Sequence, residues 1–312
     1  MTFEARFVTI VLVAFAWASL VGSLAAPLVF ARLRVSAPVD RARALLRLRL
    51  LPLAAGLLAA SLAALSFALF EPRALDETYG YVLRGLAIVP LVLLAASLLR
   101  TAVAVWRTRR VLQGWLDGAR PVTLDGLTIP ALATDSAFPV VAVLGIVRPR
   151  LLIARSVLDT CSPDELQAIL AHEQAHVDRH DNLFRLLLNA TPDLLSWLPA
   201  AGRLHGAWQE ATEFAADDAA GRHGDLGRVT LAQALVRVAR LAPAGPQLVP
   251  TSALYRGERL EQRVARLLVP TETSRRHPSR ARQALVALAL VASLATLEML
   301  HEAFEIAAAV LP

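Results

Sequence analysis

Cysteine and charged residues are scarce in this sequence. Cys161 is the single cysteine among 312 residues, which excludes an internal disulfide framework and a cysteine-rich zinc module. Charged residues make up 19% of the chain and hydrophobic residues 56%, a balance too apolar for an ordinary soluble domain of this length. We therefore expect a membrane protein, in which a metal site would use histidine and carboxylate ligands.

Lysine is absent, so the positive side of the formal net charge of +6 comes from arginine alone. A net positive charge can indicate nucleic-acid binding, but these arginines flank apolar runs. We interpret them mainly as membrane-topology signals with some affinity for lipid headgroups, and we expect no direct nucleic-acid partner.

Long apolar segments lie at about 7–31, 50–70 and 85–106, and a fourth lies at about 283–300. A helix needs about 20 apolar residues to cross a bilayer, so we predict four transmembrane helices. The first segment could instead be a signal peptide. Its apolar run is longer than the usual ~7–15 residues and Pro27 stands where cleavage would fall, so we expect it to be retained.

The arginines also predict the orientation, because short basic loops face the cytoplasm. The connection after the first apolar segment is rich in arginine, whereas the next connection, EPRALDETYGY, is net acidic. Arginines also follow the third segment and precede the fourth. We expect a multi-pass protein of the cell membrane (inner or plasma membrane) with extracytoplasmic N- and C-termini and a cytoplasmic middle region.

This pattern predicts three parts. Residues 1–106 form three transmembrane helices, residues 107–282 form one cytoplasmic domain, and residues 283–312 form the fourth helix and a short extracytoplasmic tail. The fold class is mainly α, with a cytoplasmic α+β domain. In that domain FPVVAVLGIVRPRLLIA predicts short strands or a hairpin, because β-branched residues surround Gly145 and Pro149.

The stretch LFRLLLNATPDLLSWLP, residues 183–199, is apolar but does not have the form of a fifth span. Arg185, Asp193 and two prolines interrupt it. We expect a buried or membrane-skimming pair of helices here.

The stretch ILAHEQAHVDRHDN, residues 169–182, carries the strongest chemical signal. Ser162 and Glu165 form the pattern of a capping box, which predicts that a helix starts here and runs through the motif. His172 and His176 are then one turn apart, about 6 Å along the axis, and can bind one zinc ion. Glu173 lies beside the metal, in the position of a general base. The alternative is a chance HExxH on an exposed helix.

A third protein ligand must complete such a site. On an uninterrupted helix His180 would lie about 12 Å from His172, too far to share an ion, and no glycine precedes it to turn the chain. We interpret His180 as a surface residue or a partner of the site. In WQEATEFAADDAAG, Glu213 and Asp217 share one helix face, so we predict Glu213 as the ligand and Asp217 as a carboxylate that orients a motif histidine. The alternative is a solvated acidic face.

Together these features resemble the BlaR/MecR-type membrane metallopeptidases that relay antibiotic sensing. HEQAHVDRHD is similar to the extended motif of that family, and EFAAD is similar to its downstream glutamate motif. The resemblance implies a gluzincin-like domain in which His172, His176 and Glu213 bind Zn²⁺ and Glu173 is the catalytic base. The two motifs also include Asp181 and Asp217, which the resemblance places around these ligands.

The resemblance further implies a zinc-dependent, membrane-bound endopeptidase that acts on a cytosolic or membrane-adjacent protein in signalling or regulated proteolysis. The strand-like stretch around Gly145 could pair with an extended substrate, or it could be a hairpin that covers the core. Expected partners are a protein or peptide substrate, with a transcriptional repressor as one candidate, and the lipid bilayer. The sequence does not indicate an oligomeric state.

One departure from the family concerns the C-terminus. The antibiotic receptors carry a penicillin-binding sensor after the last membrane helix, whereas this sequence ends at LEMLHEAFEIAAAVLP, so we do not expect a β-lactam receptor. Two alternatives remain open. They are a non-catalytic membrane signalling or scaffold protein and a quality-control membrane protease of the HtpX/Ste24 type.

Overall fold

The computed structural model describes residues 2–33, 35, 37–71, 79–222, 227–242 and 257–269. These residues are mainly helical and include one small sheet, which confirms the expected mainly α class. The fourth apolar segment and the C-terminal tail lie outside the described residues. The elements are α1 (Phe3–Ala31), α2 (Pro38–Phe70), α3 (Tyr81–Leu116), β1 (Arg120–Val122), β2 (Ala131–Thr134), β3 (Val141–Leu144), β4 (Arg150–Ala154), α4 (Arg155–Thr160), α5 (Pro163–Asp178), α6 (Asp181–Ala190), the 3₁₀ helix η1 (Leu194–Trp197), α7 (Pro199–Ala220), α8 (Gly227–Leu241) and α9 (Gly257–Leu268).

Helices α1, α2 and α3 are long and apolar enough to cross a membrane, so the chain is a membrane protein. They extend beyond the apolar segments of the sequence, because arginine is a good helix former and the chain stays helical outside the apolar runs. The arginine-rich residues 41–49, which we expected in a loop, therefore form the first turns of α2. With 33 residues, α2 is about 50 Å long, well beyond the ~30 Å of a hydrocarbon layer.

Helices α1 and α2 pack closely where one of them has a glycine. A β-carbon on Gly22 would come within 2.9 Å of Pro52, and one on Gly56 within 2.8 Å of the Phe15 ring. Small residues at such crossings let two membrane helices approach each other closely. At the end of the pair near the N-terminus, Arg6 and Glu71 form a buried ion pair of 2.6 Å.

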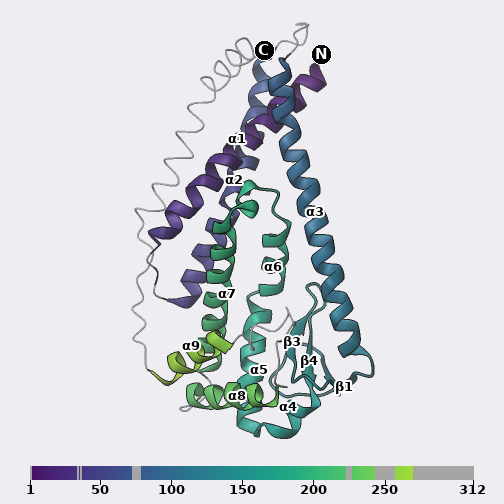
Figure 1. Ribbon diagram of the computed structural model, residues 1–312, viewed down its shortest axis with the longest axis vertical. Coiled ribbons are helices and arrows are strands. Elements are labelled where there is room, and N and C mark those ends of the chain that lie inside the picture. The colour runs from purple at the N-terminus through teal and green to yellow at the C-terminus, as the bar shows by residue number, and fades with distance from the viewer. Residues whose placement is uncertain are drawn as a thin grey trace.

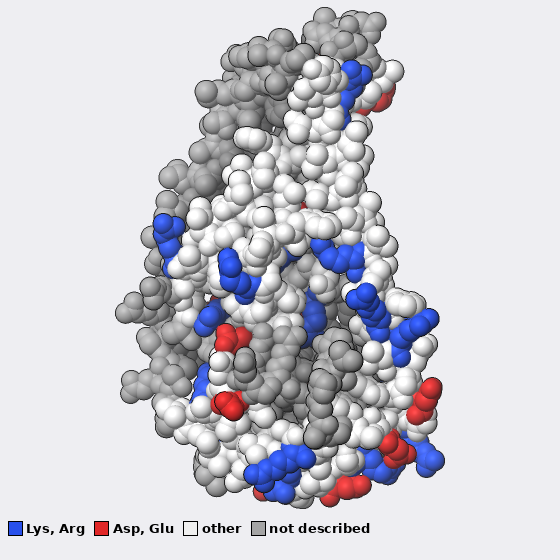
Figure 2. Space-filling model, in the orientation of Figure 1, with Lys and Arg blue, Asp and Glu red and all other residues white. Residues whose placement is uncertain are grey.

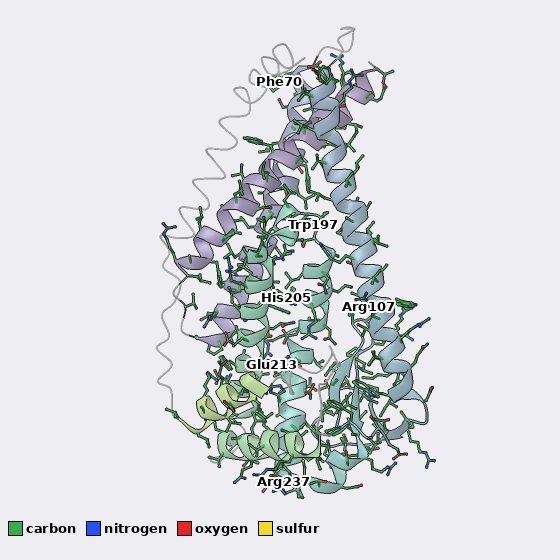
Figure 3. The ribbon with its side chains drawn as sticks, in the orientation of Figure 1. Phe70, Arg107, Trp197, His205, Glu213 and Arg237 are labelled. Carbon is green, nitrogen blue, oxygen red and sulfur yellow. The ribbon has the colours of Figure 1, made fainter. Side chains whose placement is uncertain are left out.

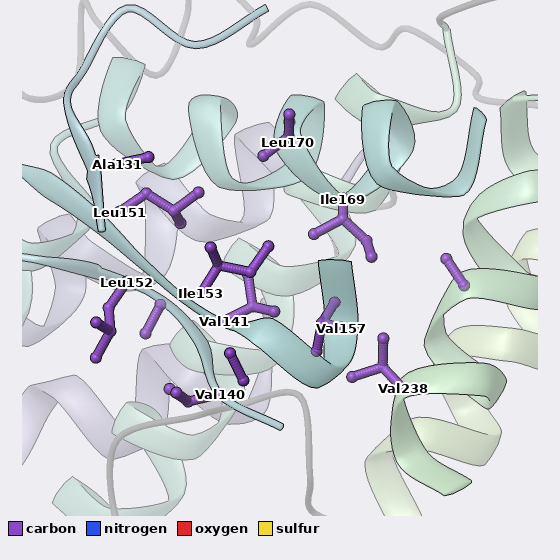
Figure 4. Close-up of a cluster of buried hydrophobic side chains, with 13 residues drawn as sticks. Ala131, Val140, Val141, Leu151, Leu152, Ile153, Val157, Ile169, Leu170 and Val238 are labelled. Carbon is purple, nitrogen blue, oxygen red and sulfur yellow. The ribbon is translucent and has the colours of Figure 1, made fainter. Parts of the chain in front are cut away.

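The sheet has the strand order β1-β2-β4-β3, in which β2 and β4 are parallel and the other two pairs are antiparallel. Strands β3 and β4 form the predicted hairpin around Gly145, whose positive φ of 87° suits glycine. Leu151, Leu152 and Ile153 of β4 are fully buried and form a core with residues of α4, α5 and α8 (Figure 4). Since β3 contacts α5, this core positions the strand beside the HExxH helix.

Helices α6 and α7 form a hairpin that enters the space between the long helices. Figure 1 shows them between α2 and α3, with η1 at the tip of the hairpin, while the sheet, α4, α5, α8 and α9 lie at the opposite end of the molecule. Leu188, Leu195 and Leu204 of the hairpin share a buried apolar cluster with Ala26 of α1 and Leu45 of α2. Residues 183–199 thus form a pair of helical segments, as expected from the sequence, with one side buried against α1 and α2 and residues such as Trp197 exposed on the other.

The HExxH helix, α5, starts as its sequence predicts. The Ser162 side chain accepts a hydrogen bond from the Glu165 backbone, and the Glu165 carboxylate accepts one from the Ser162 N–H, which confirms the capping box. Arg237 of α8 also lies 2.9 Å from Glu165. The start of α5 is therefore fixed both to its own cap and to α8.

Candidate metal centre

Helices α5 and α7 bring the predicted metal ligands together. His172 and His176 lie one turn apart on α5, and Glu213 of α7 faces both of them. The donor atoms of these three residues lie within 4.8 Å of one another. His172 and Glu213 are buried, and His176 is partly exposed, so the group is open to solvent on the side of His176.

The separations between the donor atoms fit one small tetrahedral ion. The two Nε2 atoms of His172 and His176 are 3.2 Å apart, and they lie 3.5 Å and 3.6 Å from the two oxygens of Glu213. Ligands bound to zinc at ~2.0–2.1 Å in a tetrahedron are roughly 3.4 Å from one another. The residues present therefore fit a metal of the size and geometry of zinc.

An aspartate carboxylate lies near the Nδ1 atom of each imidazole. His176 Nδ1 forms a hydrogen bond of 2.6 Å with Asp181 Oδ2. His172 Nδ1 lies 3.1 Å from Asp217 Oδ1, a contact without good hydrogen-bond geometry. A carboxylate at Nδ1 favours the tautomer with its proton on that nitrogen, which leaves the Nε2 lone pair free for a metal. In that tautomer both Nε2 lone pairs point toward one region and lie 3.2 Å apart, an arrangement that a bound cation would stabilise.

The buried charges around the site also favour a divalent cation. Buried carboxylates come from four residues, Glu173, Asp181, Glu213 and Asp217. Arginines pair with three of these carboxylates: Arg179 with Asp181, and Arg263 with Glu213 and Asp217. Metal binding requires neutral histidines, and the four carboxylates and two arginines then leave two negative charges that a divalent cation would compensate. Buried charge is costly unless it is paired in this way.

Arg263 of α9 is a site residue that the sequence analysis did not identify. It is buried, and it donates two hydrogen bonds to Asp217, from Nη2 to Oδ1 at 2.6 Å and from Nε to Oδ2 at 2.9 Å. Its Nη1 lies 3.2 Å from Glu213 Oε2, an ion pair without good hydrogen-bond geometry. One guanidinium therefore fixes both carboxylates that α7 contributes to the site.

The site strongly shifts the acid–base properties of its members. Burial alone would raise the pKa of Glu213, but His176, His172 and Arg263 hold it well below its usual range. Burial alone would lower the pKa of His172, but the carboxylates of Asp217 and Glu213 raise it to about 9. Burial raises the pKa of Glu173 despite the attraction of both histidines. Glu213 is thus a permanent anion, whereas Glu173 is shifted toward the range of a general base.

The chain between α5 and α6 differs from the uninterrupted helix that we expected. Helix α5 ends at Asp178, and His180 adopts a left-handed conformation with φ of 56°. Histidine reaches this region more readily than most residues, so no glycine is needed. The turn leaves His180 exposed and outside the metal group, and it brings Asp181 to His176.

Asn182, the next residue, joins the site to the sheet. Its side-chain amide donates to the Val143 carbonyl at 2.9 Å and to the Gly145 carbonyl at 3.1 Å. These carbonyls face away from β4, because alternate residues of an antiparallel strand point to opposite sides. Since β3 is at the edge of the described sheet, its outer side faces the α5–α6 turn.

A small cavity lies next to Glu173. It is lined by Val141 of β3, by Ile169, His172 and Glu173 of α5, and by apolar residues of α8. Its volume of about 10 Å³ is close to the space that one water molecule needs. The catalytic base predicted from the sequence is thus close to open space on the strand side of the site.

These features define an α-helical membrane protein with a His–His–Glu group suited to a metal and a buried glutamate beside it. Residues 129–267 match the model of the BlaR1 peptidase M56 family. No curated protein matches the chain. The match over this part of the chain agrees with the resemblance seen in the sequence, supports a BlaR1/MecR-type family assignment and points to a membrane metallopeptidase.

Asp181→Asn is expected to weaken metal binding by about 10- to 100-fold, because the carboxylate that orients His176 is lost. The measurement is zinc retention of the purified protein against a competing chelator. His180→Asn is the control, since asparagine accepts the left-handed conformation and His180 is outside the metal group. A larger loss of zinc in His180→Asn than in Asp181→Asn would contradict this assignment.

Arg263→Met is expected to destabilise the protein by about 3–5 kcal/mol, because it leaves two buried carboxylates without their cation. Arg263→Lys should also be destabilising, since lysine cannot make the bidentate contact with Asp217. Thermal unfolding in detergent measures the effect, with the exposed neighbour Gln262→Ala as the control. Wild-type stability of both Arg263 variants would show that the pair is unimportant.

Proposed function

We propose that this protein is a zinc-dependent endopeptidase that hydrolyses peptide bonds of a cytosolic or membrane-adjacent protein in signalling or regulated proteolysis. The observation that carries the proposal is the position of three donors at tetrahedral separations with a buried glutamate next to one of them. The family match supports the same reading. A His₂Glu set is a known catalytic zinc arrangement that leaves a position open for water or substrate.

Each residue has a separate role in the proposed reaction. A bound zinc ion would polarise the water and the substrate carbonyl and make the water a stronger nucleophile near neutral pH. Glu173 accepts the proton of the attacking water and then donates it to the leaving amine. The raised pKa of Glu173 suits both transfers. Asp181 and Asp217 keep the two imidazoles in the orientation that binds metal.

The outer side of β3 is the proposed place for an extended substrate. It is an edge strand in contact with α5, and Val141 lines the cavity beside Glu173. A substrate strand that pairs with this edge would be held by backbone hydrogen bonds largely independent of its sequence. Asn182 already occupies two carbonyls of the edge, so a substrate would displace this side chain or pair further along β3.

Glu173→Gln is expected to reduce proteolysis by roughly 10²- to 10⁴-fold while zinc is retained, because the amide cannot accept the proton of water. The measurement compares protein fragments in cells that produce either the wild type or this variant, with zinc content determined on the purified proteins. Glu210→Gln makes the same chemical change on α7 at a partly exposed position. Unchanged fragments with Glu173→Gln would favour the non-catalytic scaffold alternative.

We also propose that the metal centre faces the cytoplasm, on the basis of the arginines that flank the membrane helices. Val147, in the turn between β3 and β4, is 90% exposed and provides a reporter on the same side as the site. In a Cys161→Ser background, Val147→Cys is expected to react with a membrane-impermeant maleimide only after the cells are opened. Labelling in intact cells would reverse the proposed topology.

A further inference from the structure

The tip of the α6–α7 hairpin, residues 188–198, lies among the membrane helices. We call these residues the apex. Leu195 is fully buried, and its backbone N–H donates to Ser23 Oγ of α1 at 3.1 Å. Along the long axis of the molecule, Trp197 lies between Phe70, which ends α2, and Arg107, which follows the third apolar segment (Figure 3). Glu213 lies on the far side of Arg107, away from Phe70.

The apex interrupts the helices with irregular backbone, which is costly inside a bilayer unless its polar groups have partners. Membrane helix α2 supplies these partners through the buried Arg49. Its guanidinium lies 2.7 Å from Asp193 Oδ2, and it donates to Thr191 Oγ1 at 2.8 Å and Ser196 Oγ at 2.7 Å. It also donates to the Leu188 carbonyl at 3.4 Å, which accepts a second hydrogen bond from Thr191 Oγ1 at 3.0 Å.

A second arginine, Arg100 of the membrane helix α3, also binds backbone groups of the apex. It donates to the Asn189 carbonyl at 3.0 Å and to the Thr191 carbonyl at 3.3 Å. The backbone N–H of Ser196 donates to Asp193 within the apex itself. The polar groups of the turn are thus bound by the side chains of three membrane helices, which is the condition for irregular backbone at membrane depth.

The outer side of the apex is apolar. Trp197 is 64% exposed, and Leu187 of α6 and Leu198 are also exposed. On the face shown in Figure 2, basic side chains form a band across the middle of the molecule, and the surface between this band and the upper end is nearly uncharged. Tryptophan is enriched where a protein surface passes from the hydrocarbon layer to the headgroups. Lipid is the partner that an exposed tryptophan at this level fits best.

We propose that the apex enters the lipid bilayer as a shallow re-entrant hairpin and that Trp197 and Leu198 contact lipid. It lies at the ends of the apolar segments that are closer to the metal site, near Arg49 of α2 and Arg100 of α3. Lipid thus covers the outer side of the apex, while the membrane helices cover its polar turn. This inference concerns the membrane contact of the hairpin and does not depend on the proposed peptidase activity.

Depth-dependent fluorescence quenching tests the proposal on the full chain in lipid nanodiscs. In a Cys161→Ser background, an environment-sensitive dye is attached to Trp197→Cys, or to Leu198→Cys if the first variant does not fold. Nitroxide-bearing lipids are the quencher inside the bilayer, and dithionite is the quencher from water. Leu99→Cys, 66% exposed on α3, is the reference for lipid contact, and Val147→Cys is the reference for water.

The expected result is quenching by the nitroxide lipids to at least half the extent seen at Leu99→Cys, with slower reaction with dithionite than at Val147→Cys. A thermal unfolding midpoint equal to that of the parent protein shows that each labelled variant is folded. Rapid reaction with dithionite at the level of Val147→Cys would place the apex in water and overturn the proposal. Protection from both quenchers would show that protein covers the apex, and this would overturn it as well.

Discussion

The contacts of two aspartates with two histidines are the interaction on which the metal centre depends. Asp181 approaches His176 from the turn after α5, and Asp217 approaches His172 from α7. Each aspartate fixes the ring orientation and the tautomer of its histidine, so both Nε2 atoms face Glu213. If either ring turned over, Cδ2 would face the aspartate in place of Nδ1 and Cε1 would take the place of Nε2, so the two Nε2 atoms would no longer converge.

The features of the site that the sequence predicts are those set by spacing within one helix. The capping box fixes the start of α5, the interval of four residues brings His172 and His176 to one face, and the same interval does so for Glu213 and Asp217. Arg263 could not be predicted in this way. GERLEQRVARLL contains three arginines with similar local surroundings, and only the packing of α9 against α7 selects Arg263 for the site. The pair between Arg49 and Asp193, 144 residues apart, is hidden for the same reason.

The chain turns at His180, where the sequence suggested a continuous helix, yet His180 still lies outside the metal group. The absence of glycine suggested a continuous helix, but contacts on both sides of the turn stabilise the left-handed residue. Arg179 binds Asp181 at 3.0 Å and the Thr212 carbonyl of α7 at 3.1 Å, and Asn182 binds the edge of β3. These tertiary contacts outweigh the modest cost of a positive φ at histidine. Through residues 179–182, these contacts also fix the positions of β3, His176 and α7 relative to one another.

The same hairpin connects the metal centre to the membrane helices. Helix α6 has Asp181 at one end and, about 15 Å away, the backbone groups that Arg49 and Arg100 bind at the other. Helix α7 starts beside the apex and carries Glu213 four turns further along. A shift of α2 or α3 by one helical turn would therefore break the arginine contacts or move Asp181 and Glu213 relative to α5. Because donor separations near 3.4 Å tolerate only small displacements, the packing of the membrane helices and the geometry of the metal centre cannot vary independently.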